Sequence, residues 1–175
     1  MVTITISGTP GSGKTTVAGL LEKKLGMKYI YSGMIFRELA EKHNMSLEEF
    51  GKFCEENCEI DKELDDKQLK ILKKGNVILE GRLAGWLAYK NKISAFKILI
   101  DADIDTRAKR IVNREEGFVE KRKKEIQKRE KSEAKRYKDY YGLNLNDKSI
   151  YDIVIDSANK TPEEILEIII KKLKR

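Results

Sequence analysis

Cysteine and histidine are scarce in this chain of 175 residues, which contains two cysteines and one histidine. These side chains cannot supply the four ligands of a structural zinc site built from cysteine and histidine alone. Cys54 and Cys58 lie four positions apart in a stretch with a helical pattern. We therefore expect two small side chains on one helix face, and neither a disulfide nor a zinc centre.

Long apolar runs are also lacking, because no stretch reaches the roughly 18 consecutive apolar residues that indicate a transmembrane helix. The chain begins directly with a predicted strand, so we expect no signal peptide. Its length suits one domain with its own core. We expect a single domain over residues 1–175 that acts in the cytoplasm without a membrane partner.

Positive charge is unevenly distributed along the chain. Residues 107–138 contain 14 lysines and arginines against 6 aspartates and glutamates, whereas the whole chain has a net charge of +7. The rest of the chain therefore has a slight excess of negative charge. A basic excess confined to one segment favours a local site for a polyanion over a general nucleic-acid surface.

What the chain does contain is a glycine-rich loop with a defined chemistry. Residues 8–15 fit the pattern G-x-x-x-x-G-K-S/T, between a β-branched run at 2–6 and a helical pattern. The N–H groups of such a loop close around a phosphate. Lys14 can reach the β- and γ-phosphates of ATP, and the Thr15 hydroxyl can bind Mg²⁺. The predicted nucleotide-binding residues of the loop are Gly8, Thr9, Pro10, Gly11, Ser12, Gly13, Lys14, Thr15 and Thr16.

Short apolar strands alternate with helical patterns along the whole chain. Strands are expected over 2–7, 28–31, 77–79, 96–100 and 152–155. Helices are expected over 13–25, 34–43, 47–57 (opened by a capping box of Ser46 and Glu49), 60–74 and 84–90, in a charged region over 104–138, and after the N-cap Thr161. This alternation predicts an α/β fold in which a five-stranded parallel sheet is flanked by helices.

Each noticeable polar cluster comes directly after a predicted strand. These clusters are the glycine-rich loop, Ser32-Gly33, Glu80-Gly81-Arg82, Asp101 and Asp156. In open parallel sheets, ligands bind at the carboxyl ends of the strands. The sequence therefore predicts that these clusters share one site.

Two further patterns suit phosphate groups. Ser32-Gly33 with Arg37 places a hydroxyl, backbone amides and a guanidinium at one helix start, and guanidinium groups bind phosphate oxygens in pairs. Arg129 and Arg136 lie seven positions apart, which places them two helical turns apart on one face. From the residues alone, an N-cap serine with an unrelated surface arginine, and a solvated charged helix, are the alternatives.

These motifs, in this order and spacing, resemble those of the nucleoside-monophosphate kinases, and within them the short archaeal-type cytidylate kinases. The resemblance covers almost the whole chain and rests on the glycine-rich loop, Tyr31–Arg37, Glu80-Gly81-Arg82, Arg129 with Arg136, and residues 152–157. It implies a three-layer P-loop kinase fold with acceptor-binding helices at about 32–60 and a short mobile lid at about 107–138. It also implies Mg²⁺-dependent phosphoryl transfer from ATP to CMP and dCMP by a monomer without nucleic-acid partners.

The resemblance implies roles for individual residues as well. The implied catalytic residues are Lys14, Arg82, Arg110, Arg129 and Arg136. The implied acceptor-binding residues are Ser32, Gly33, Arg37, Gly81, Arg82 and Glu133, with Glu133 at a position linked to the acceptor ribose. The implied metal-site residues are Thr15 and Glu80, and Arg107 joins the glycine-rich loop in binding the donor nucleotide.

The chain departs from the bacterial cytidylate kinases in two respects. Leu83 follows Arg82, where the bacterial pattern carries an aspartate that is associated with the acceptor sugar. The bacterial insertion that helps to read cytosine is absent. We therefore expect other residues, within the helices at about 40–60, to read the base, and we expect tolerance of changes at the ribose 2′ position.

Two other functions remain open from the sequence. One is another small P-loop kinase, such as an adenylate, dephospho-coenzyme A or shikimate kinase. The other is an RNA-associated P-loop ATPase. The confined positive charge, the lack of RNP-type aromatic residues and the absence of an N/T-K-x-D guanine signature argue against the second.

Overall fold

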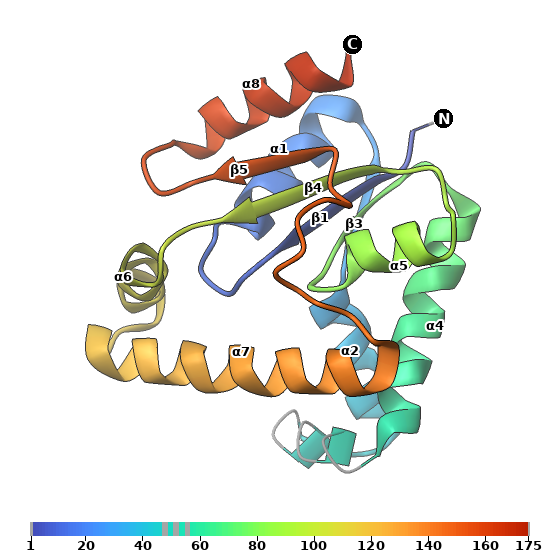
Figure 1. Ribbon diagram of the computed structural model, residues 1–175, viewed down its shortest axis with the longest axis vertical. Coiled ribbons are helices and arrows are strands. Elements are labelled where there is room, and N and C mark those ends of the chain that lie inside the picture. Colours follow the sequence, from blue (N-terminus) through green and yellow to red (C-terminus); the bar gives the residue numbers. More distant parts are fainter. Residues whose placement is uncertain (1, 47–48, 51–52, 55–56, 175) are drawn as a thin grey trace.

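Five short apolar segments pair as strands of one sheet in the computed structural model, which describes residues 2–46, 49–50, 53–54 and 57–174. The strands are β1 (Ile4–Gly8), β2 (Lys28–Tyr31), β3 (Val77–Glu80), β4 (Phe96–Asp101) and β5 (Ile153–Asp156). They lie in the order β2-β3-β1-β4-β5, and all neighbours are parallel (Figure 1). The predicted five-stranded parallel sheet is confirmed.

The register brings the carboxyl ends of the strands to one edge of the sheet. Tyr31 of β2 pairs with Glu80 of β3, and Asp101 of β4 pairs with Asp156 of β5. Gly8, the last residue of β1, lies between these pairs, beside the end of β4. The polar clusters that follow the strands therefore leave the sheet at one edge, although Asp101 and Asp156 line a separate cavity and not those of the other clusters.

Helices cover both faces of the sheet. Those of the described residues are α1 (Lys14–Leu25), α2 (Ser32–Lys42), α4 (Cys58–Lys74), α5 (Ala84–Lys90), α6 (Ile104–Glu115), α7 (Val119–Tyr141) and α8 (Pro162–Leu173). On one face, Val17 of α1 and Ile169 of α8 share a buried cluster with the sheet. On the other, Leu72 of α4 and Ala84 of α5 share a second cluster, which also includes α2. None of the helices in the described part of the chain combines the length and apolar character needed to span a bilayer.

Helix ends follow the capping signals in the sequence. The Thr161 hydroxyl accepts a hydrogen bond from the Glu164 N–H at 3.2 Å, and the Thr161 N–H donates to the Glu164 carboxylate at 2.7 Å. Ser46 and Glu49 make the same reciprocal pair, at 3.2 and 2.8 Å. The helix predicted over 47–57 lies partly outside the described residues.

Three predicted helical regions differ in extent, and one of them, α4, begins at Cys58, two residues earlier than expected. The charged region 104–138 is divided into α6 and α7 by Glu116 and Gly117, whose φ angles of 61° and 109° interrupt a right-handed helix. The two helices pack against each other around Ile126. Helix α2 begins at Ser32, two residues earlier than expected. Figure 1 shows α7 crossing beside the sheet, from α6 towards α2 and α4.

Candidate active site

Glycines shape the loop between β1 and α1. Gly11 and Gly13 have φ angles of 81° and 87°, a left-handed conformation that other residues rarely adopt. A Cβ atom at Gly8 would lie 2.3 Å from the carbonyl oxygen of Ile100 on β4. Gly13 is the N-cap of α1 and provides no side-chain hydrogen bond. The first N–H groups of α1 are therefore left for an anion, which the helix dipole also favours.

A cavity of about 590 Å³ opens beside this loop. We call it the donor cavity. It lies between the glycine-rich loop, the helices α6 and α7, and the start of α8. Arg110 and Arg114 of α6 and Arg122 and Arg129 of α7 line it. Guanidinium groups are well suited to phosphate oxygens. Four arginines of the basic segment thus line this cavity, as a local polyanion site requires.

Glu80 is the last residue of β3, and its buried carboxylate lies beside Lys14 and Thr15 at the end of the glycine-rich loop. Its Oε1 accepts a hydrogen bond from Thr15 Oγ1 at 3.1 Å and lies 3.8 Å from Lys14 Nζ. Its Oε2 accepts a hydrogen bond from the Tyr29 hydroxyl. Burial and the neighbouring carboxylate raise the pKa of Tyr29, so this hydroxyl keeps its proton and remains a donor. Burial lowers the pKa of Lys14, and the nearby Glu80 charge opposes that shift.

The Thr15 hydroxyl and the Glu80 carboxylate fit a magnesium ion that arrives with a nucleotide. In sites for nucleoside triphosphates, Mg²⁺ is bound through one or two protein oxygens together with phosphates and waters. No group of three or more His, Cys, Asp or Glu side chains within the described ranges is arranged to hold a metal. The donor set therefore suits Mg²⁺ carried by phosphates and not a metal enclosed by the protein.

Arg110 and Arg107 of α6 have different surroundings. Arg110 lines the donor cavity, and its guanidinium donates to Ser157 Oγ at 2.9 Å and to the Ser157 carbonyl at 2.6 Å. Arg107 is buried and is not among the residues that line this cavity. Its Nε donates to the Ala102 carbonyl at 2.9 Å, and its Nη1 donates to Glu130 at 2.7 Å. The structure thus places the predicted donor-binding Arg107 among protein groups that link α6 to α7.

A second, smaller cavity of about 230 Å³ lies between α2, α4 and α7. We call it the acceptor cavity. Ser32 and Gly33 of α2 line it together with Arg82, Arg129 and Arg136. Arg129 lines the donor cavity as well, so one guanidinium stands at the boundary between the two spaces.

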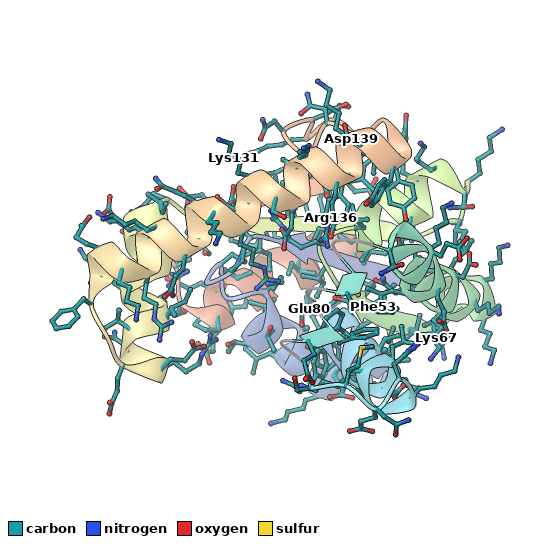
Figure 2. The ribbon with its side chains drawn as sticks, turned by 90° about the horizontal axis from the view of Figure 1, so that it is seen from below. Phe53, Lys67, Glu80, Lys131, Arg136 and Asp139 are labelled. Atoms are coloured by element: carbon teal, nitrogen blue, oxygen red, sulfur yellow. The ribbon has the colours of Figure 1, made fainter. Side chains whose placement is uncertain are left out.

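Helix α7 has one side that faces the sheet and one that faces away. Figure 2 shows Arg136 on the side that faces the sheet, and Lys131 and Asp139 on the opposite side. Lys131 and Asp139 are exposed, whereas Arg136 is half-buried. The helical spacing of Arg129 and Arg136 therefore brings both to the acceptor cavity, as predicted from the sequence.

Glu133 holds two of the predicted arginines. Its Oε2 accepts a hydrogen bond from Arg82 Nε at 2.6 Å, and its Oε1 accepts one from Arg129 Nε at 2.8 Å. The residue is only 5% exposed. Burial alone would raise the pKa of this carboxyl, but the Arg82 and Arg129 charges outweigh it and hold the pKa below its ordinary value. Glu133 is therefore an anion that fixes the two guanidinium groups beside the acceptor cavity.

Arg37 lies outside the acceptor cavity. It is exposed, and its Nη1 donates to the Tyr31 hydroxyl at 2.8 Å. The cavity is also lined by residues that the sequence does not predict as part of the site, among them Phe36, Asp65, Gln68 and Tyr137. None of the described residues in 40–60 lines it, so the cavity gives no support to the prediction that this range reads the base, and part of the range lies outside the described residues. Asp65 and Gln68 lie in a charged helical segment that gives no signal of a site in the sequence.

The fold and the site define a class of protein. A phosphate loop after the first strand of a parallel sheet, with arginine-bearing helices around two adjoining cavities, is a P-loop kinase architecture. A shikimate kinase structure from Bacteroides thetaiotaomicron matches 99% of both chains with a TM-score of 0.70 at 13% identity. One from Aquifex aeolicus covers 99% of this chain and 96% of its own, with a TM-score of 0.61 at 20% identity. At such identities the likeness shows the fold alone.

Sequence comparison narrows the class to a family. The sequence profile of the cytidylate kinase-like family matches residues 3–159. A cytidylate kinase of Pyrococcus horikoshii is 44% identical over 166 residues, which cover 95% of this chain and 85% of that protein. A cytidylate kinase of Methanococcus vannielii is 43% identical over 172 residues, which cover 98% and 99%. The chain belongs to the cytidylate kinase-like family, which confirms the resemblance inferred from the motifs.

Proposed function

We propose that this protein is a cytidylate kinase, which transfers the γ-phosphoryl group of ATP to CMP, and also to dCMP, giving ADP and CDP or dCDP. The observation that carries the proposal is the position of Arg129, which lines both the donor and the acceptor cavity. Two spaces that suit phosphates meet at one guanidinium, as a direct transfer between two nucleotides requires. Membership in the cytidylate kinase-like family supports CMP as the acceptor.

ATP binds in the donor cavity, where residues 8–16 and Lys14 in particular hold its β- and γ-phosphates. Arg110 and Arg129 line the same cavity and stabilise the charge of the transferring group. When Mg²⁺ is bound, Thr15 and Glu80 hold it, and it neutralises charge on the phosphates. Arg107 supports the loop from the protein side, because its Nη1 also donates to the Pro10 carbonyl at 3.4 Å.

The acceptor phosphate binds between α2 and α7. Arg82 holds it, Arg136 stabilises the charge that develops on it during transfer, and Ser32 with Gly33 adds a hydroxyl and backbone N–H groups. Arg37, which is exposed, exchanges its hydrogen bond with Tyr31 for the acceptor phosphate. Gly81 allows the close approach of these groups.

Glu133 acts on the acceptor through its partners. Both of its carboxylate oxygens accept hydrogen bonds from arginines, so we assign it to holding Arg82 and Arg129 in place and not to direct contact with the ribose. A carboxylate that fixes two long, flexible side chains reduces the entropy lost when they bind a phosphate.

Transfer proceeds by positioning and charge stabilisation. An oxygen of the acceptor phosphate attacks the γ-phosphorus, and the bond from that phosphorus to the β–γ bridging oxygen breaks, so the electron pair leaves with ADP. Little covalent chemistry falls to the protein in such reactions. We infer that residues at about 107–138, which belong to α6, α7 and their connection, form a mobile lid. This lid closes over the acceptor-binding residues at about 32–60 and excludes water.

The same arrangement favours small-molecule partners. Arginines of the basic segment line the donor cavity, which supports a nucleotide site over a nucleic-acid surface. We also propose that the protein acts as a monomer in the cytoplasm. Its partners are then ATP, CMP and dCMP, without a membrane or a nucleic acid.

A panel of acceptors tests the proposal. ADP release is measured with ATP as donor and CMP, dCMP, UMP, AMP or shikimate as acceptor. We expect the highest kcat/KM for CMP, with dCMP within about tenfold, or roughly 1.4 kcal/mol, because Leu83 offers no carboxylate to the 2′-hydroxyl. A value for AMP or shikimate equal to that for CMP would reject the cytidylate assignment. Salt-dependent RNA binding without acceptor turnover would instead favour the RNA-associated ATPase.

A further inference from the structure

Gln68 of α4 has a buried polar atom for which the described part of the chain provides no hydrogen-bond partner. The residue is 2% exposed and lines the acceptor cavity. Its Nε2 donates to Asp65 Oδ1 at 3.2 Å, whereas its Oε1 has no hydrogen-bond partner among the residues that the structure describes. A buried carbonyl oxygen without a donor costs about 1–3 kcal/mol. Such an atom in the wall of a cavity can accept a hydrogen bond from a water or from a bound ligand.

The orientation of this amide is fixed by its neighbours. If the amide were turned by half a rotation, Oε1 would face the Asp65 carboxylate, which as an anion can only accept hydrogen bonds. Asp65 is in turn held by Tyr141 at the end of α7, whose hydroxyl donates to Oδ2. The chain of contacts from Tyr141 through Asp65 to Gln68 therefore turns an acceptor, and not a donor, towards Gly81 and Ser32 at the wall of the cavity.

Gly81 keeps the space beside this oxygen open. A Cβ atom on Gly81 would lie 3.1 Å from Gln68 Oε1 and 2.9 Å from Ser32 Oγ, so even a methyl group would crowd both. Phe36 lines the same cavity and offers an aromatic surface to a flat ring. The arginines of the cavity suit the phosphate of an acceptor nucleotide, which leaves the neutral amide oxygen for its base.

We propose that Gln68 Oε1 reads the acceptor base by accepting a hydrogen bond from the exocyclic amino group of cytosine. This inference rests on the proposed function. Cytosine carries an amino donor where uracil carries a carbonyl acceptor, so a bound uridylate would bring two desolvated oxygens together with no proton between them. A site built to pair one donor rejects an analogue without it by orders of magnitude. Adenine also has an exocyclic amino group, so Gln68 separates CMP from UMP and not from AMP.

The test compares Gln68→Met, which keeps the volume of the side chain and removes the amide, with Gln127→Leu. Gln127 is the second glutamine of the chain and is exposed on α7. For Gln68→Met we expect kcat/KM for CMP to fall by at least about 100-fold, with UMP changed by less than about threefold. The KM for ATP and the Tm should stay close to those of the wild type. Gln127→Leu should leave all of these values unchanged.

A second variant keeps the inference testable if Gln68→Met does not fold. Asp65→Asn removes the anion that fixes the amide, so Gln68 can turn Nε2 towards the cavity, and the ratio of kcat/KM for CMP to that for UMP should fall at least tenfold by the same reasoning. An unchanged ratio of kcat/KM for CMP to that for UMP in whichever of the two variants folds would overturn the role of Gln68 while leaving the cytidylate kinase intact. A wild-type enzyme that does not phosphorylate CMP would overturn both proposals.

Discussion

Burial at the start of α1 disfavours the charged form of Lys14 and lowers its pKa. Its Nζ lies 3.8 Å from the Glu80 carboxylate and donates to the Thr9 carbonyl at 3.3 Å. Neither contact is a close ion pair. The ammonium is therefore incompletely compensated until a phosphate of the donor nucleotide arrives.

Lys14→Ala should reduce kcat by about 10²–10³, the loss typical of a group that stabilises developing charge. The Tm should change little, since Glu80 keeps its hydrogen bonds from Thr15 and Tyr29. Lys24→Ala, an exposed position on the same helix, serves as the control and should behave as the wild type. A Lys14 variant that retains more than about a tenth of the wild-type rate would contradict this role.

The ionised form of Glu133 stabilises the fold over a defined pH range. Its pKa in the folded protein is lowered, so the unfolded chain takes up a proton first as the pH falls below the ordinary value of about 4.3. Its contribution is therefore fully present above that value and is lost as the pH falls through the folded pKa.

We expect Glu133→Gln to have a lower Tm than the wild type at about pH 7, and the difference to shrink towards about pH 3.5. Thermal melts at both pH values measure this, with Glu167→Gln, exposed on α8, as the control. A difference of equal size at the two pH values would show that the charge of Glu133 is not its source.

Arg37 belongs to the acceptor side by its position in α2. Arg37→Ala should raise the KM for CMP by roughly tenfold or more, the equivalent of one charge-assisted hydrogen bond, and leave the KM for ATP unchanged. Steady-state kinetics with each nucleotide varied in turn measure both constants, and Glu41→Ala on the exposed side of α2 is the control. Equal increases in the two constants would mean that Arg37 contacts the other nucleotide.

The residues of α7 that line the acceptor cavity lie on one face of the helix. Arg136 lines the acceptor cavity from the side that faces the sheet, whereas Lys131 lies on the opposite side (Figure 2). Alanine is the strongest helix former, so replacing either residue preserves the helix. Any difference between the two variants therefore reports the direction of the side chain.

We expect Arg136→Ala to lower kcat by about 10³-fold, as the loss of an arginine that stabilises transition-state charge does, and Lys131→Ala to change it by less than about twofold. Turnover with ATP and CMP gives both values, and circular dichroism checks that helix content is retained. Similar small losses in the two variants would remove Arg136 from the catalytic set.

Across the whole molecule, the parts predicted from the sequence are those with local signals. The strands follow from short apolar runs, and the start of α8 from its capping box at Thr161. The acceptor cavity is different, because Asp65 and Gln68 reach it only through the packing of α4 against distant segments. The burial of Arg107 is equally non-local, since Ala102 and Glu130 make its contacts. No spacing along the chain encodes such encounters.

The boundary position of Arg129 has a thermodynamic consequence for substrate binding. Its side chain is 63% exposed, and Glu133 contacts it through Nε at the end of a long, flexible stem, so the guanidinium as a whole can still shift before nucleotides arrive. Whichever nucleotide binds first restrains it, and the second then binds a side chain that has already lost that freedom. Such cooperativity is reciprocal by necessity. ATP therefore tightens the binding of CMP by the same factor by which CMP tightens the binding of ATP.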